Sequence, residues 1–75
     1  MSQRLPRGSW RKVVQAFEKR GWRVTRQRGS HVILEKAGCE ATLSIPRHDT
    51  IGPGLLRSLI RDAEMTVAEF VELYE

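Results

Sequence analysis

Arg26-Gln27-Arg28-Gly29-Ser30-His31 decides the fold, because it is a glycine-containing turn between two strand-like segments. The turn is expected over residues 27–30, with strands over residues 22–26 and 32–36 on either side of it. A second turn, at Ala37-Gly38, leads into a third predicted strand over residues 41–45, which Pro46 ends. Connections this short join only antiparallel neighbours. The sequence therefore predicts a three-stranded antiparallel meander.

Helical periodicity is found on both sides of this meander. The first helix is expected to be capped by the hydroxyl of Ser9 and to end at Gly21 in a left-handed conformation. A second helix is predicted over residues 53–63, and the capping box Thr66-Val67-Ala68-Glu69 begins a short last one. The apolar faces of the first two helices are predicted to consist of Trp10, Val13, Val14 and Phe17, and of Leu55, Leu56, Leu59, Ile60 and Ala63.

This order of elements predicts the fold class. The chain is expected to be an α+β protein with a helix, a three-stranded antiparallel sheet, a second helix and a short C-terminal helix. Helices packed on one face of a single sheet leave the other face open to solvent or a ligand. At 75 residues we expect one domain, residues 1–75, which buries roughly 60% of the surface that its unfolded chain exposes.

The alternation of the second strand decides which way His31 points. Either Val32 and Leu34 face the core, or His31, Ile33 and Glu35 do. The second choice buries an imidazole and a carboxylate without obvious partners, which costs several kcal/mol. We therefore expect His31, Ile33 and Glu35 on the open face of the sheet.

The charge of the chain is basic and uneven. Lys and Arg number 13 against 9 Asp and Glu, and residues 1–28 contain a single acid, Glu18. A basic pole of this kind indicates a nucleic acid or an acidic protein as partner, although a merely solvated surface has the same composition. The lone Cys39 forms no disulfide framework, and no apolar run has the length of a membrane span. We expect a cytoplasmic protein with no membrane partner.

Most kinds of catalytic site are excluded by the pattern of residues. His31, Cys39 and His48 do not have a common zinc spacing, and no glycine loop has the lysine and hydroxyl of a phosphate-binding loop, so neither a metal nor a small-molecule cofactor is expected. The basic turn remains. An imidazole can both take and give a proton near neutral pH, as RNA cleavage by its own 2′-hydroxyl requires. Arg26 and Arg28 are expected to hold the phosphate, and Gly29 to let it approach the backbone. The alternative is that His31 is an ordinary exposed turn residue.

Five segments of the chain occur in a recognisable order: Gly21-Trp22, residues 26–31, Ile45-Pro46-Arg47-His48, residues 54–63 and residues 66–70. Together they make the chain resemble the HicA family of toxins from bacterial toxin-antitoxin systems. The resemblance implies a fold similar to a double-stranded RNA-binding domain, a metal-independent endoribonuclease that cuts mRNA, and a HicB-type antitoxin that covers the site. It also assigns the catalytic histidine of the glycine-serine-histidine turn to His31, with Ser30 a candidate for orienting the phosphate.

Other residues have less certain roles. His48 is either a second proton-transfer group or a turn residue, while Arg23 and Arg57 are expected to contact further phosphates. Two positions depart from the HicA pattern: Leu55 replaces a small hydroxyl residue, and Glu64 replaces a glycine, which predicts a different ending for the second helix. Two competing functions remain open, a non-catalytic module that binds RNA and a protein-interaction module with a basic face.

Overall fold

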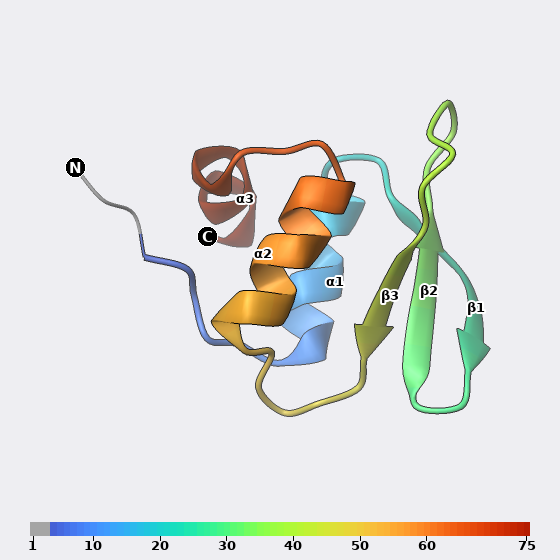
Figure 1. The fold of residues 1–75 in the computed structure, drawn as a ribbon, viewed down its shortest axis with the longest axis horizontal. Helices are drawn as coiled ribbons and strands as arrows, with labels where there is room; N and C mark the ends of the chain where they lie inside the picture. Colours follow the sequence, from blue (N-terminus) through green and yellow to red (C-terminus); the bar gives the residue numbers. More distant parts are fainter. Residues whose placement is uncertain (1–3) are drawn as a thin grey trace.

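The computed structural model describes residues 4–75 and has the predicted α+β class (Figure 1). A helix is followed by a three-stranded antiparallel sheet and then by two more helices, as the sequence predicts. The elements are α1 (Trp10–Glu18), β1 (Arg23–Arg28), β2 (His31–Glu35), β3 (Leu43–Pro46), α2 (Pro53–Asp62) and α3 (Val67–Tyr74).

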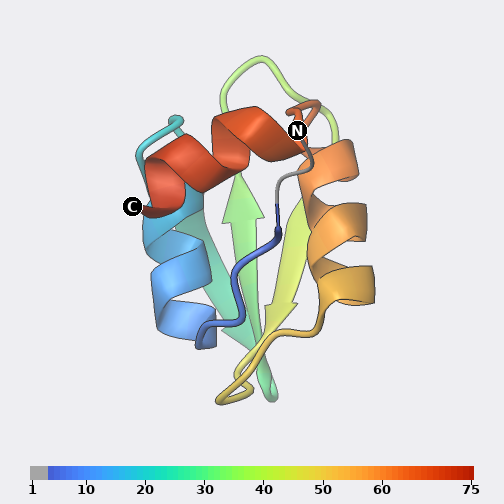
Figure 2. The ribbon, with the colours of Figure 1, turned by 90° about the vertical axis from the view of Figure 1, so that its left-hand side faces the viewer.

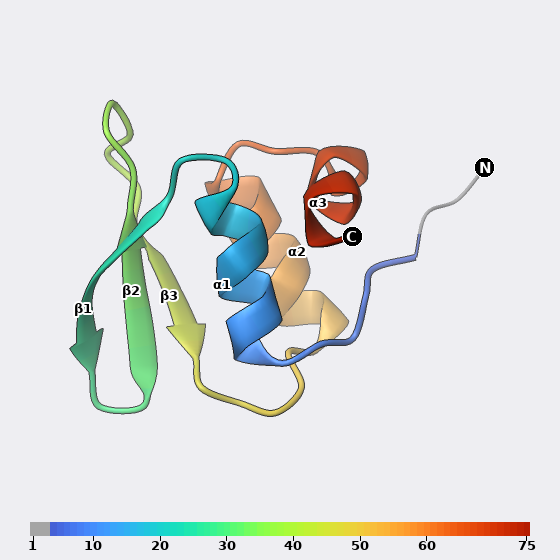
Figure 3. The same cartoon turned by 180° about the vertical axis from the view of Figure 1, so that it is seen from behind.

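The helices cover one face of the sheet. Figure 2 shows α1 and α2 side by side in front of the strands, with α3 lying across them, and Figure 3 shows β1 as the strand farthest from the helices. The core between the layers includes Phe17, Trp22, Leu34, Leu43 and Phe70, each at most 1% exposed. All six residues of β1 are exposed, because α1 and α2 pack mainly against β3, at the other edge of the sheet. The other face of the sheet is open.

The strand boundaries differ from those predicted. At the first turn they differ because the turn is tighter than expected. β1 and β2 are joined by only Gly29 and Ser30, and Gly29 has a φ of +57°. A positive φ at the first residue of a two-residue hairpin loop is where glycine is favoured. The predicted turn over residues 27–30 is therefore too long, and pairing continues to Arg28 and His31. At the other end, β3 begins at Leu43 and not at residue 41.

The start of α1 corrects one predicted cap. Ser9 occupies the N-cap position, but its hydroxyl makes no capping hydrogen bond. The backbone amide of Trp10 instead donates to the carbonyl of His48, at 3.1 Å. The loop after β3 thus supplies the acceptor for one of the backbone amides that have no partner within the first turn of the helix.

Both α1 and α2 end in the same way. After α1 the amides of Gly21 and Trp22 donate to the carbonyls of Glu18 and Phe17, and Gly21 has the positive φ predicted for it, +100°. After α2 the amide of Glu64 donates to Arg61 and that of Met65 to Ile60, the two bonds of a Schellman motif.

Two predictions about α2 are wrong, one about how the helix ends and one about which residues it buries. Glu64 adopts the left-handed conformation, with a φ of +58°, so that the helix keeps the ending that a glycine would give it. Leu55 is 38% exposed and not buried, since Ile51, 1% exposed, fills the core before the helix begins. Leu56, Leu59, Ile60 and Ala63 are buried as predicted.

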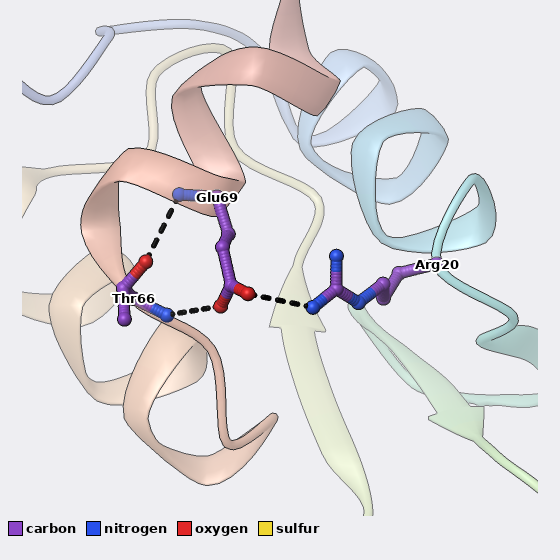
Figure 4. A network of polar contacts seen from close by, with 3 residues as sticks. All are labelled: Arg20, Thr66 and Glu69. Carbon is purple, nitrogen blue, oxygen red and sulfur yellow. Dashed lines mark hydrogen bonds and ion pairs between the residues drawn. The ribbon is translucent and has the colours of Figure 1, made fainter.

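The predicted capping box at α3 is confirmed. The Thr66 hydroxyl accepts from the Glu69 amide at 3.1 Å, and the Glu69 carboxylate accepts from the Thr66 amide at 2.8 Å. Figure 4 shows that Arg20, just after α1, also contacts this carboxylate, at 2.9 Å. The Thr66 amide, followed by the Arg20 guanidinium, lowers the pKa of the Glu69 carboxyl below its ordinary value of 4.5.

Candidate functional site

The turn before His31 is held from both sides. The side-chain amide of Gln27 donates to the carbonyl of Gly29 at 3.2 Å. The backbone amide of Arg47, just after β3, donates to the carbonyl of Ser30 at 2.8 Å. His31 follows immediately as the first residue of β2 and pairs with Arg28. Its backbone position is therefore fixed by two strands and two further hydrogen bonds.

A β-bulge in β1 brings three arginines to the face that carries His31. The pairs are Arg28 with His31, Arg26 with Ile33 and Arg23 with Glu35, and the register shifts between residues 24 and 26. Residues opposite each other in antiparallel strands point to the same face. Regular alternation would have placed Arg23 and Arg26 on opposite faces. The bulge therefore completes a row of arginines, Arg23, Arg26 and Arg28, on the face of His31.

His31 and two of these arginines line a shallow hollow of about 390 Å³ on the open face. The imidazole is exposed, and its Nδ1 lies 3.5 Å from the Ser30 hydroxyl, at the outer limit of a hydrogen bond. Ile33 is on the same face, as predicted, but it is only 8% exposed and makes an apolar patch in the hollow. The residues that line it are Arg26, Arg28, His31, Ile33, Thr42 and Ser44.

This arrangement suits a phosphodiester. Two guanidinium groups supply donors with the fork geometry that matches phosphate oxygens, and no acid lines the hollow to compete for them. Histidine is also the side-chain type among the lining residues that most often serves as a general acid or base. Of the lining residues, the sequence reasoning missed Thr42 and Ser44. Ser44 was recognisable only from the β2–β3 register, which sets it opposite Ile33.

The other predicted site residues lie elsewhere. Arg23 lines a second hollow, on the same open face. His48 is exposed and does not line the His31 hollow, although its carbonyl binds the start of α1. Arg57, in α2, lines a separate hollow with Arg4 and Arg7. The structure thus places His31 in one hollow with Arg26 and Arg28, and places Arg57 in a different hollow.

Neither a metal cluster nor a membrane helix is found in the described residues. Within residues 4–75 no three histidine, cysteine or carboxylate side chains lie close enough together to share a metal ion. None of the helices in that range is both long and apolar enough to cross a membrane.

Fold and site together define a small α+β protein with a histidine and arginines on the open face of its sheet. A family model described as "HicA toxin of bacterial toxin-antitoxin" matches residues 10–65, from the first residue of α1 to Met65, just beyond α2. The chain therefore belongs to the HicA toxin family, which implies an antitoxin as its partner. A comparison with curated proteins finds no match.

Proposed function

We propose that this HicA-family toxin is an endoribonuclease that cuts mRNA in the cytoplasm by acid–base chemistry at His31, without a metal ion. The observation that carries the proposal is the hollow in which an exposed imidazole lies beside Arg26 and Arg28 on the open face of the sheet. A single RNA strand can reach this face, because α1, α2 and α3 all lie on the other side of the sheet (Figure 1).

The reaction uses the 2′-hydroxyl of the RNA as nucleophile. His31 takes the proton of that hydroxyl, whose oxygen attacks the neighbouring phosphorus while the bond to the 5′-oxygen breaks. The leaving 5′-oxygen takes a proton from water, and His31 returns its own proton to the solvent, so that the products are a 2′,3′-cyclic phosphate and a 5′-hydroxyl. The Ser30 hydroxyl contacts Nδ1 and so leaves Nε2 of His31 for the substrate.

The arginines stabilise the charge that develops in this reaction. Negative charge grows on the phosphate oxygens as the 2′-oxygen attacks, and donors already aimed at those oxygens stabilise it most in the transition state. Arg26 and Arg28 project from the strand that pairs with His31, so their backbones need not move to reach the same phosphate. We infer that Gly29, which has no Cβ, lets the RNA backbone approach the turn closely.

We also propose that a HicB-type antitoxin neutralises the toxin by covering the open face. The row of arginines on that face favours an acidic partner surface, which would keep RNA from His31.

The test is cleavage of a defined single-stranded RNA in EDTA by the wild-type protein and by His31→Ala. We expect fragments with 2′,3′-cyclic phosphate ends from the wild type and none from the variant. Because His31 is exposed, the variant should keep the thermal unfolding midpoint of the wild type. His48→Ala in the same assay determines whether the second histidine takes part.

Two results would overturn the proposal. Equal cleavage by His31→Ala would place the catalytic group elsewhere. Intact RNA in every lane, with a shift in mobility, would mean that the protein is a non-catalytic RNA-binding module.

A further inference from the structure

A second hollow lies beside the His31 hollow on the open face, and its chemistry is different. It has a volume of about 430 Å³ and shares Thr42 with the first hollow, so the two are neighbours. Its lining includes two carboxylates, Glu35 and Glu40, two cations, Arg23 and Lys36, and the hydroxyl of Thr25. Glu35 is four residues from His31 on β2, which is about 13 Å along a strand. A ligand in the second hollow is therefore a different nucleotide from the one at His31.

The two carboxylates are available to a ligand. Neither Glu35 nor Glu40 makes a side-chain hydrogen bond or an ion pair within residues 4–75, although Arg23 stands opposite Glu35 in the sheet. Both carboxylates accept hydrogen bonds and repel phosphate. The Thr25 hydroxyl donates to the carbonyl of Ile33 at 3.5 Å, which leaves its lone pairs as further acceptors. The hollow therefore offers acceptors to N–H donors, while Arg23 and Lys36, which also line it, offer donors to a carbonyl oxygen.

We propose that the second hollow reads a guanine base near the cleaved bond, with Glu35 as the specificity-determining residue and Glu40 assisting it. The proposal rests on the proposed function in that RNA is the ligand of the open face. Guanine presents N1–H and the 2-amino group side by side, so that both can donate to the two oxygens of one carboxylate. Uracil presents its N3–H between two carbonyl oxygens, which a carboxylate repels. Unstacked bases of single-stranded RNA are commonly recognised along this edge.

The test is binding, so that it does not depend on cleavage. The full chain with His31→Ala is titrated with three labelled RNA heptamers: all uridine, one central guanosine, and one central inosine. A bidentate contact of this kind discriminates between bases by about fivefold or more. We expect the guanosine heptamer to bind at least that much more tightly than the uridine one. Inosine, which lacks the 2-amino group, should lie between them.

Two charge-matched variants locate the preference. Glu35→Gln should reduce the ratio of guanosine-heptamer affinity to uridine-heptamer affinity to a value between about 1 and 2, because a side-chain amide has only one acceptor oxygen. Glu72→Gln removes the same charge from the exposed side of α3 and should leave the ratio unchanged. Using the ratio cancels the general gain in RNA affinity that follows from losing a negative charge.

The outcomes separate this inference from the proposed function. Equal binding of the guanosine and uridine heptamers overturns it, and so does a preference that survives both Glu35→Gln and Glu40→Gln. Absence of any RNA binding overturns it as well. If the wild type fails to cut RNA but guanine is preferred through Glu35, the inference stands and the endoribonuclease proposal falls.

Discussion

The row of arginines on the open face predicts how strongly salt weakens RNA binding. Arg23, Arg26 and Arg28 point to the face of His31, so a short RNA lying there has about three phosphates neutralised. At about 0.7 per phosphate for a single strand, the slope of log affinity against log salt is about −2. Raising the salt from about 50 to 200 mM should therefore weaken binding roughly 20-fold. Arg26→Gln should reduce the slope to about −1.4.

The assay is a salt titration of fluorescence anisotropy with a short RNA, in the His31→Ala background so that the RNA stays intact. Arg57→Gln is the matched control, because Arg57 lies in another hollow, beside Arg4 and Arg7. It should leave the slope at about −2. An unchanged slope for Arg26→Gln, or an equal reduction for Arg57→Gln, would refute the placement of the RNA on the open face.

Three further predictions concern stability, each measured by urea unfolding. Gly29→Ala should cost about 1–2 kcal/mol, because a Cβ there has no neighbour within 4 Å and the left-handed backbone is the only obstacle, and Gly29→Asn should cost less. Glu64→Gly should stabilise by about 0.5 kcal/mol, since relief of the left-handed strain exceeds the conformational entropy lost by glycine. The pKa of Glu69 is lowered in the folded protein, so its stabilising effect is present above pH 4.5 and is lost as the pH falls through the lowered, folded-state pKa. The Glu69→Gln variant should therefore be less stable than the wild type at neutral pH, and its stability should depend less on acid. These expectations would be contradicted by a higher free energy of unfolding for Gly29→Ala or a lower one for Glu64→Gly. An unchanged acid dependence of stability for Glu69→Gln would contradict the third.

The sequence was informative wherever burial or a short connection left one choice. The turn at Gly29-Ser30 is too short for anything but an antiparallel hairpin, and an unpartnered imidazole is too costly to bury, so both the meander and the exposure of His31 follow. The same reasoning failed for Ser9 and Leu55. In both cases a residue outside the helix took the role that the local pattern gave to another residue. The His48 carbonyl, far from α1 in the sequence but in contact with it, accepts the hydrogen bond at the helix start. Ile51, just before α2, takes the buried place predicted for Leu55.

The second hollow and the place of Arg57 were beyond sequence reasoning, because both depend on how segments far apart in the chain come together. Thr42 is in the loop before β3, yet it lines both hollows of the open face. Arg57 was grouped with the phosphate contacts on charge alone, whereas the segment before α1 brings Arg4 and Arg7 beside it. Charge indicates what a side chain can bind, and only the topology indicates which other groups share the ligand.

The bulge in β1 has a physical cause that links the core to the site. Counting back from Arg28, which the turn sets on the open face with His31, regular alternation would put Trp22 on the open face as well. Trp22 is 1% exposed and packs in the core. One extra residue, between Val24 and Arg26, reverses the alternation, so that Trp22 turns inward and Arg23 turns outward. Burial of Trp22, just before β1, therefore adds Arg23 as the third arginine to the face on which we place the RNA.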